Sequence, residues 1–496
     1  TKVKSASNIT INGTGSWGLT LYDSALIQST GGNIAITANG SWGGLYFDST
    51  ATGGIVASND TTNPTTATPT TGGTLTINAT GRSTYGLQVG AGSLVSNGAM
   101  SLTGTGVAEA LYIYGSGGIK SNGDITLSGT ATHATSYWGI YLNNSRTIQS
   151  AGGNIVMNAS GAGGIYMNGG AIVAGNDTTT PTSGGTITIN SSARGPDITA
   201  AGLRIDTDST KIIGYGDISI YANGAPSGLN TSGAGHGVIL YGSYQTIRSY
   251  NGKLTMTGYA NHGVGAVDNW ANISGGITLW NGSNILRSKG DLTLNGVSMP
   301  GIGIYLTVAT AAGGSVTSDN GNITINGQNA ARNWGVSFHT TGTVQSTAGN
   351  IDITGVGTGA VFMRNVALVA ANNVNSPASG GTITINGTGS SDYGFYKESG
   401  SLFSYGGITV NASSTGSRAS YYGGAGSVKS VGGITLTNTS TSGYNWGTYV
   451  TDNQLIQSTT GNITITSSGQ AGAYIYGRVV AADSESNPTT GGGITL

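Results

Sequence analysis

One short phrase recurs along the whole chain, and it constrains the fold more than any other feature. The phrase "GGNIAITANGSWGGLYF" at 31–47 returns as "GGNIVMNASGAGGIYM" at 152–167 and as "GNITINGQNAARNWGVSF" at 321–338. The first apolar residue after the glycines serves as an anchor for each repeat. The anchors are Ile9, Ile34, Leu75, Met100, Ile125, Ile155, Ile187, Ile218, Leu254, Leu292, Ile323, Ile351, Ile383, Ile408, Ile434, Ile463 and Ile494.

The spacing of these anchors favours a solenoid. Successive anchors lie 25 to 41 residues apart, and repeats of this length indicate solenoids, propellers or arrays. A propeller blade needs four strands, and a closed disc does not accommodate 17 such repeats, whereas a solenoid does. The phrase "GGITLW" at 275–280 fits either as a further anchor or as a second strand within a long coil.

Each repeat contains three short alternating segments, which predicts three strands per coil. Residues 26–29, 33–36 and 44–47 are examples of the third, first and second strand, respectively. Alternation directs Ile, Leu, Val and Met inward and Thr, Tyr and Gln outward. The sequence therefore predicts an all-β chain, a triangular parallel β-helix (β-solenoid) of about 17 coils that forms one continuous repeat region over residues 1–496.

Composition excludes several other classes. Only 7% of residues are charged, the net charge is −1, and no Lys or Arg cluster occurs, so nucleic acid is not an expected partner. The sequence contains no run of 18 apolar residues, so no membrane span is predicted. The 89 glycines show no period of three, which excludes collagen, and the chain has no cysteine for disulfides or thiolate metal sites.

Four connections between a third strand and the next anchor are longer than the others and have similar sequences. They read "VASNDTTNPTTATPTTGG", "VAGNDTTTPTSGG", "VAANNVNSPASGG" and "VAADSESNPTTGG". Asx and Pro residues predict projecting turns at one corner. The loops are either tolerated insertions or contact sites for a receptor or glycan. The candidate contact residues are Asn59, Asp60, Asn176, Asp177, Asn372, Asn373 and Asp483.

The Gly-Asn-Ile-Thr-Ile phrases, the Ile-Gln-Ser third strands and the scarcity of charge and cysteine resemble the shafts of filamentous-haemagglutinin-type proteins. These proteins are bacterial exoproteins and adhesins exported by two-partner or autotransporter routes. The resemblance covers residues 1–496 and implies a right-handed β-helix, a location outside the cell or on the bacterial surface, and a role in adhesion or biofilm. It implies that other copies, neighbouring repeats, or a cell-surface glycan or receptor are the partners.

Catalysis is not expected. Enzymes of the parallel β-helix class that act on polysaccharides gather Asp, Arg and Lys on one outer face. The comparable stretch here is "LRIDTDSTK" at 203–211, where a local ion-pair patch is the simpler interpretation. His133, His236, His262 and His339 share no spacing that would predict a metal site. The sequence therefore predicts neither an enzyme nor a cofactor.

Three outward columns invite a functional interpretation. One is an aromatic column on the second strand, which either stacks to stabilise the solenoid or binds glycan or a neighbouring rod. Its members are Tyr46, Tyr112, Tyr141, Tyr166, Tyr305, Tyr396 and Tyr449. A threonine column on the first strand is typical of ice-binding β-helices, but Ala35, Val156 and Asp352 interrupt it. Asparagines such as Asn158 and Asn190 are expected to close the first strand and form a ladder at a corner.

Two functional hypotheses from different classes remain. The first is the shaft of an adhesin, and the second is a structural subunit of an extracellular filament or sheath. The sequence starts a coil at 8–11 and stops within a first strand at 493–496. Because a solenoid end exposes an unpaired edge, we expect either a segment of a longer repetitive chain or end-to-end stacking of subunits.

Overall fold

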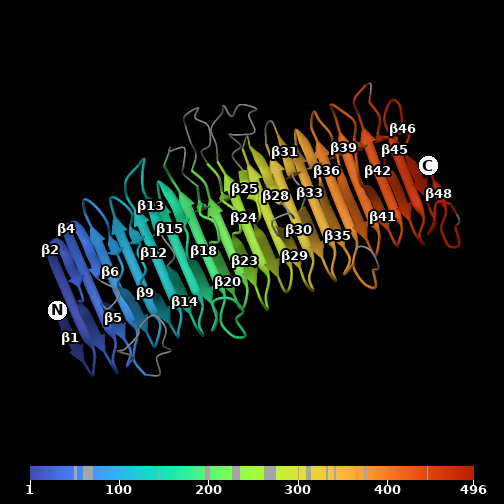
Figure 1. Ribbon diagram of the computed structural model, residues 1–496. Coiled ribbons are helices and arrows are strands. Elements are labelled where there is room, and N and C mark those ends of the chain that lie inside the picture. The colour runs from blue at the N-terminus through green and yellow to red at the C-terminus, as the bar shows by residue number, and fades with distance from the viewer. Residues whose placement is uncertain are drawn as a thin grey trace. The chain divides into compact units, whose positions relative to one another are not determined.

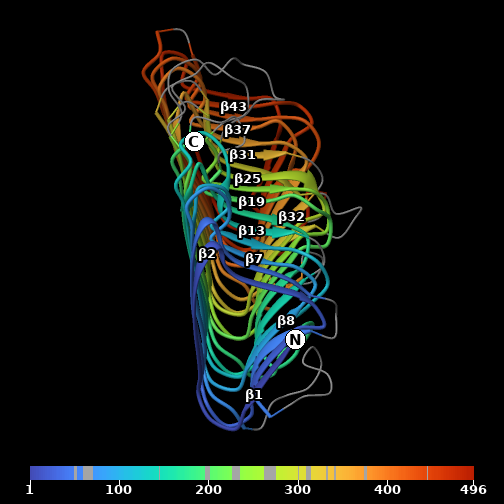
Figure 2. The same cartoon turned by 90° about the vertical axis from the view of Figure 1, so that its left-hand side faces the viewer.

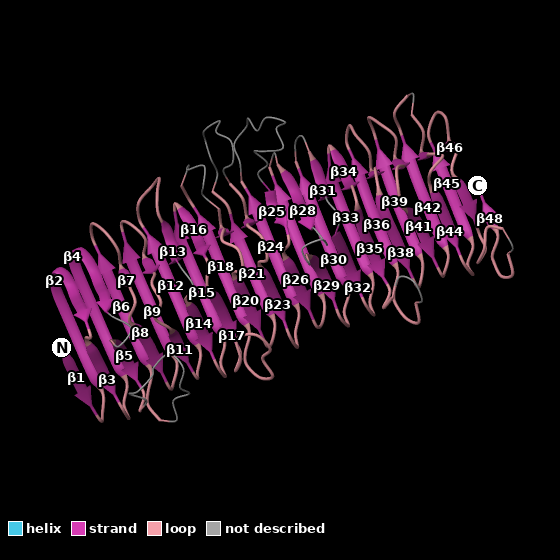
Figure 3. Cartoon of the chain, in the orientation of Figure 1, coloured by secondary structure: helices cyan, strands magenta, loops and turns pink. Residues whose placement is uncertain are grey.

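The structure is a computed structural model. It describes residues 1–49, 53–59, 71–143, 146–195, 201–225, 235–261, 275–299, 301–308, 314–330, 333–339, 342–373, 377–443, 445–486 and 488–496. Every regular element of these residues is a strand (Figure 3). The chain forms two compact units, Thr1–Tyr241 with Gln245–Gly252, and Gly242–Tyr244 with Lys253–Leu496. Asp60 and His262, singled out above, lie outside the described residues.

The first unit contains β1 to β23 (Figure 1). Its first strands are β2 (Ile9–Asp23), β4 (Ile34–Ser49), β6 (Leu75–Gly81), β9 (Met100–Gly106), β12 (Ile125–Ala131), β15 (Ile155–Gly161), β18 (Ile187–Ala193) and β21 (Ile218–Asn223). Because β2 and β4 continue through the next corner, they include the second strand of their coils. The separate second strands are β7 (Leu87–Val89), β10 (Leu111–Ile113), β13 (Trp138–Asn143), β16 (Gly163–Asn168), β19 (Leu203–Ile205) and β22 (Val238–Tyr241). The third strands are β1 (Lys2–Ser5), β3 (Leu26–Ser29), β5 (Gly54–Ala57), β8 (Ser93–Ser96), β11 (Ile119–Ser121), β14 (Thr147–Ser150), β17 (Ala171–Ala174), β20 (Lys211–Gly214) and β23 (Thr246–Ser249).

The second unit repeats this order from β24 to β48. Its first strands are β24 (Leu254–Ala260), β27 (Leu292–Ser298), β30 (Ile323–Asn329), β33 (Ile351–Gly357), β36 (Ile383–Gly389), β39 (Ile408–Ser414), β42 (Ile434–Ser440), β45 (Ile463–Ser468) and β48 (Ile494–Thr495). The second strands are β25 (Gly275–Gly282), β28 (Ile302–Val308), β31 (Trp334–His339), β34 (Gly359–Met363), β37 (Phe395–Lys397), β40 (Ser420–Tyr422), β43 (Thr448–Val450) and β46 (Ala473–Ile475). The third strands are β26 (Ile285–Ser288), β29 (Ser315–Ser318), β32 (Gly342–Ser346), β35 (Val366–Ala370), β38 (Gly400–Ser404), β41 (Ser427–Ser430), β44 (Leu455–Ser458) and β47 (Arg478–Val480).

The predicted β-solenoid is confirmed. Each strand pairs in parallel with its equivalent in the next coil of its unit, as Ile125 of β12 pairs with Ile155 of β15 and Ile155 with Ile187 of β18. Figure 2 shows strands of successive coils lying side by side in the first unit, coloured blue to green. Every predicted anchor begins a first strand. The ambiguous segment 275–280 is resolved as a second strand, because Ile277 of β25 pairs with Ile304 of β28.

An apolar column fills the inside of each unit. Along β15 the anchor Ile155 and Met157 are fully buried, whereas Val156 between them faces outward and is partly exposed. Pairing in register places each inward residue against its equivalent in the next coil, so Ile125, Ile155 and Ile187 form one continuous file. Burying a side chain of this size stabilises a fold by about 1.5–3 kcal/mol. Since no single coil encloses a core, this stacking provides the stability of the fold.

In many coils the corner before the first strand is fixed by an Asn or Asp that precedes the anchor. The backbone N–H of Asn154 donates to Oδ1 of Asp124 in the preceding coil at 2.7 Å. Oδ1 of Asn154 in turn accepts the N–H of Thr186 in the following coil at 2.9 Å. These bonds satisfy backbone donors that turn out of the sheet ladder. The Asn of the recurring phrase therefore forms a ladder along this corner.

The serine that ends the third strand provides a second, buried restraint. Ser150 is fully buried, and its Oγ donates to the carbonyl of Gly123 at 2.8 Å and accepts the N–H of Gly153 at 3.0 Å. Ser346 makes the same pair of bonds in the second unit, with Gly321 and Gly349. A buried hydroxyl is stable only when it is hydrogen-bonded in this way. The third residue of the Ile-Gln-Ser motif thus joins consecutive coils.

Candidate functional site

The aromatic column of the first unit lies where the sequence predicts it, but it is not continuous. The outward position of the second strand holds Tyr46, Gln88, Tyr112, Tyr141 and Tyr166 in successive coils, followed by Arg204. The ring centroids of Tyr112 and Tyr141 lie 5.1 Å apart, and those of Tyr141 and Tyr166 lie 4.8 Å apart. Gln88 separates Tyr46 from this stack.

The column of the second unit is longer than predicted. After Tyr305 and Ser337 it holds Phe362, Tyr396, Tyr421, Tyr449 and Tyr474 without interruption. Ring centroids are 5.4 Å apart between Tyr421 and Tyr449 and 4.7 Å apart between Tyr449 and Tyr474. Phe362, Tyr421 and Tyr474 were not among the predicted members of this column. Tyr305 is only 7% exposed, so it offers little ring surface to a ligand.

The stacking determines what this column can do chemically. Planes of neighbouring rings meet at 18° for Tyr141 and Tyr166 and at 7° for Tyr421 and Tyr449, so the rings cover one another's faces. A sugar packs on the face of an aromatic ring, and in this arrangement that face is already occupied. Burial, and then the hydrogen bond to Asp206, raise the pKa of Tyr166, so its hydroxyl stays protonated at neutral pH. The geometry favours cross-coil stabilisation over ligand binding.

The bases of the projecting loops are closed by the predicted Asx residues. Oδ1 of Asn176 accepts the N–H of Thr182 at 2.9 Å, and Oδ1 of Asn372 accepts that of Ala378 at 3.0 Å. The N–H of Thr71 donates to Asn59 at 3.2 Å, and the N–H of Thr489 donates to Asp483 at 2.8 Å. Because these oxygens are occupied by the backbone, the four side chains hold the loops in shape. Asn373, the next residue after Asn372, is exposed.

Among the described residues, Asp177 is the carboxylate that directly follows a loop-closing asparagine. It accepts hydrogen bonds from the hydroxyl and N–H of Thr179 and from the N–H of Thr180. These bonds lower its pKa to about 2. Bonds from Thr489 and Thr490 lower the pKa of Asp483 to about 2 in the same way. Both carboxylates therefore act as acceptors for their own loops.

Each loop also depends on the coil before it. The side-chain amides of Gln28, Gln149, Gln345 and Gln457 donate to the carbonyls of Ser58, Gly175, Ala371 and Ala482, at 3.2, 2.9, 2.9 and 3.0 Å. Each of these carbonyls belongs to the residue directly before the Asx that closes a loop. The Gln of the Ile-Gln-Ser motif is thus present in the coil that precedes a long loop, a relation that the sequence analysis missed.

A tryptophan marks the same pairs of coils. Trp138 lies over Gly163 of the next coil, where an added Cβ would come within 2.5 Å of the indole ring. Trp334 lies over Gly359 in the same way, and Trp17 over Gly43. In the fourth pair, Trp446 contacts Tyr474 instead, with ring centroids 5.1 Å apart. A loop is therefore carried by a module of two coils, in which the first supplies Trp and Gln and the second supplies the loop.

The stretch considered for catalysis forms a local ion pair. Nε of Arg204 lies 2.7 Å from Oδ1 of Asp206. The other carboxylate oxygen of Asp206, Oδ2, accepts a hydrogen bond from the hydroxyl of Tyr166 at 2.9 Å. Asp208 and Lys211 line a separate surface hollow with Asn168. Within the described residues no group of three or more His, Cys, Asp or Glu is placed to hold a metal ion. His133 is exposed, and burial lowers the pKa of buried His339 to about 4.

Two buried cations were not anticipated. Arg146 of the first unit is 5% exposed and donates to the carbonyls of Gly117, Val89 and Gly92. Lys397 of the second unit is fully buried. Its Nζ lies 2.5 Å from Oε1 of Gln454 and 3.2 Å from the carbonyl of Gly423. Burial lowers the pKa of Lys397 to about 8.

The outward asparagines form the predicted ladder, but not at a corner. Nδ2 of Asn190 donates to Oδ1 of Asn158 at 3.0 Å, and Asn411 donates to Asn386 at 2.9 Å in the second unit. β15 continues to Gly161, so Asn158 lies at the middle of its strand rather than at the end. The strand is longer than predicted because the small inward residue Ala159 lets it continue in register.

Comparisons with known proteins do not assign a family. Searches against protein-family models and against curated proteins find no match. The described part of the chain also has no helix with the length and apolar character needed to cross a membrane.

Proposed function

We propose that the chain is a non-catalytic, extracellular β-solenoid that serves as the shaft of a bacterial surface adhesin or exoprotein, in adhesion or biofilm. The observation that supports this proposal is the in-register pairing of the anchors of successive first strands, from Ile125 through Ile155 to Ile187 and from Ile351 through Ile383 to Ile408. Such a stack extends by adding coils and needs no centre of reaction.

The use of the outward residues supports the same proposal. The rings of the second strand pack on one another, and the Asx residues of the loops bind their own backbone. Arg204, the most suggestive cation of the sequence, is paired with Asp206. These polar and aromatic groups maintain the stack, which is what a shaft requires. The loops then project from a fixed base.

Display on a non-adherent bacterium tests the adhesive role. The chain is fused to an outer-membrane anchor, and the anchor alone serves as the control. We expect more retained biomass on glass and on epithelial cells from the strain that displays the chain. Retention equal to that of the anchor alone contradicts the proposal. Electron microscopy of the purified chain complements this test, because separate rods agree with a shaft and continuous filaments favour a filament subunit.

A further inference from the structure

One column of side chains has nearly the same sequence in the two units, with a single reversal of charge. It lies at the corner before the second strand, two residues before the first inward residue of that strand. In five successive coils the first unit holds Trp17, Gly43, Tyr85, Glu109 and Trp138, and the second unit holds Trp334, Gly359, Tyr393, Arg418 and Trp446. The fourth position is therefore an acid in one unit and a base in the other, and it lies between a Tyr and a Trp in both.

The two charged residues have equivalent surroundings. The backbone N–H of the residue after Glu109 donates to the carbonyl of Trp138 at 3.3 Å, and the N–H of the residue after Arg418 donates to that of Trp446, also at 3.3 Å. Glu109, Arg418 and the Tyr and Trp on either side of each are all partly exposed. Equivalent backbone thus presents opposite charges among partly exposed aromatic rings.

Neither charge is paired with an opposite charge among the described residues. Oε2 of Glu109 is buried and accepts no hydrogen bond from these residues, and burial raises the pKa of this carboxyl. Arg418 donates from Nη1 to the hydroxyl of Tyr393 at 3.1 Å, and its Cζ lies 4.6 Å from the ring centroid of Tyr449. Its buried Nε has no acceptor in the described part of the chain. Each side chain therefore retains a polar atom without a partner.

Other arginines that pack on the aromatic columns have a carboxylate of their own. Cζ of Arg364 lies 5.6 Å from the ring centroid of Phe362, and its Nη2 lies 2.8 Å from Oε2 of Glu398. In the first unit, Arg204 is likewise paired with Asp206. A partly desolvated charge without a counter-charge is costly. A counter-charge from another molecule would therefore stabilise the two unpaired residues.

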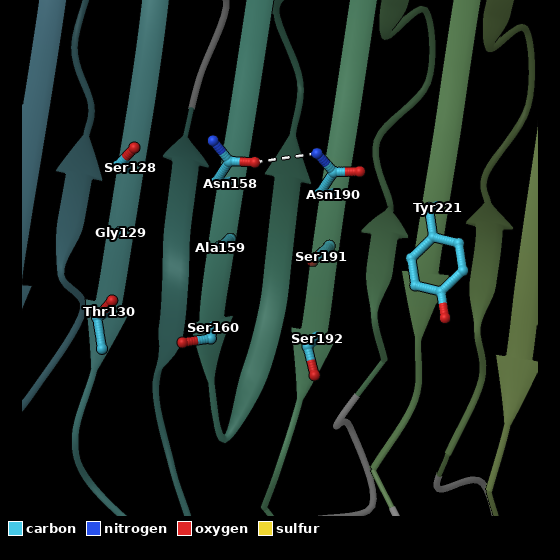
Figure 4. A pocket seen from close by; sticks show the side chains of 10 residues that line it. All are labelled: Ser128, Gly129, Thr130, Asn158, Ala159, Ser160, Asn190, Ser191, Ser192 and Tyr221. Carbon is cyan, nitrogen blue, oxygen red and sulfur yellow. Dashed lines mark hydrogen bonds between the residues drawn. The ribbon is translucent and has the colours of Figure 1, made fainter.

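We propose that this corner of the first unit packs against the equivalent corner of the second unit in another copy of the chain, with Glu109 facing Arg418. Each residue supplies the charge that the other lacks, and Tyr, Trp and Arg contribute most to the stability of protein interfaces. The groove over β12, β15, β18 and β21 is lined by uncharged residues alone, so it has no charge to direct such a contact (Figure 4). The proposal goes beyond the role of a shaft and does not depend on it, because it names a partner for the side of the stack.

Sedimentation velocity of the full chain tests this contact. We expect the parent to associate as its concentration rises. Glu109→Arg and Arg418→Glu should each weaken association about tenfold, because like charges then meet. An equimolar mixture of these two variants should associate again, since each copy of one variant meets opposite charges on a copy of the other. The matched control is Ser160→Lys in the groove of Figure 4, where an added charge should leave association unchanged.

Three results would overturn the proposal. These are a parent that stays monomeric at about 100 μM, single variants that associate as tightly as the parent, or a mixture that associates no better than either variant alone. Circular dichroism and thermal unfolding verify that each variant is folded, which we expect because the other unit already holds the introduced charge between a Tyr and a Trp. In the display experiment, retention equal to that of the anchor alone, together with restored association in the mixture, would contradict the adhesive role and leave this contact supported.

Discussion

The first unit buries an arginine and the second a lysine, and the two sites are satisfied differently. Arg146 reaches three carbonyls of earlier coils, which use the forked N–H groups of its guanidinium. Lys397 has one amide oxygen and one carbonyl, and no carboxylate pairs with it among the described residues. A buried ammonium without a counter-charge is costly. Both cations are buried at a penalty, and burial lowers the pKa of each, to about 9 for Arg146 and to about 8 for Lys397.

The largest loss of stability should come from disrupting the apolar column that both units contain. Ile155→Asp and Ile383→Asp each place a carboxylate in the apolar column, where both positions are fully buried, and should cost several kcal/mol of unfolding free energy. Val156→Asp and Asn386→Asp, one and three residues further along the same strands, face outward with uncharged partners in register and should cost little. Urea unfolding followed by circular dichroism compares the four variants. Equal losses within a pair would contradict the assignment of inward and outward residues.

The buried lysine should make stability depend on pH. Burial lowers its pKa in the folded state to about 8, whereas the unfolded pKa is about 10.4. Between these values the unfolded chain holds the proton and the folded chain does not, so raising the pH favours the folded state. Below pH 8 both states are protonated and this contribution is constant. The gain from pH 8 to pH 10 should be on the order of 3 kcal/mol at most.

Lys397→Met is the matched control for this dependence. It keeps most of the apolar side chain and removes the charge, so the difference between variant and parent should be largest below pH 8 and should shrink as the pH approaches 10. Urea unfolding at pH 7, 8, 9 and 10 measures this difference. A constant difference across the range would show that Lys397 does not titrate between the two states.

The contacts between tryptophan and glycine should be equivalent in the two units. Gly163→Ala and Gly359→Ala place a Cβ within 2.5 Å of Trp138 and Trp334, respectively, and should each cost about 1–3 kcal/mol. Gly443→Ala is the control, because an added Cβ meets no atom within 4 Å. Thermal unfolding compares the three variants. A loss in one unit alone would indicate that the two modules are packed differently.

The smallest effect is expected from the aromatic columns. Replacing Tyr141 and Tyr166 together by Ser should cost about 1 kcal/mol and leave the β-type circular dichroism intact. The pair Tyr421 and Tyr449 should cost more, because the rings of Tyr396 and Tyr474 contact it on its two sides, whereas Arg204 ends the stack of the first unit. Thermal unfolding of the two double variants tests this order. Loss of the fold in either would mean that the rings are essential rather than supporting.

Sequence alone predicts the backbone of this protein well, because a parallel solenoid repeats its inward residues at fixed register. All anchors were correct for this reason, including those next to loops of different length. The outward residues were harder to predict. The aromatic column was incomplete at Phe362, Tyr421 and Tyr474, since stacking requires only a ring at that position and not a particular preceding sequence.

The buried polar groups were missed although a signal was present. Strict alternation through Phe395 and Tyr396 directs Lys397 inward, but no prediction was made for this residue. Arg146 lies at a corner, where alternation gives no direction, so only the structure reveals its position. The role of Gln149 depends on the adjacent coil 26 residues away, and no pattern within its own coil shows it.

The glutamine contacts also define what is inherited together when such a chain grows. The amide of Gln149 holds a loop that belongs to the following coil, and Trp138 of the same coil requires the glycine at 163. Duplication or transplantation of a single loop-bearing coil would separate the loop from both supports. The smallest portable cassette for engineering a display loop into another β-solenoid is therefore a pair of consecutive coils, from the tryptophan to the asparagine that closes the loop.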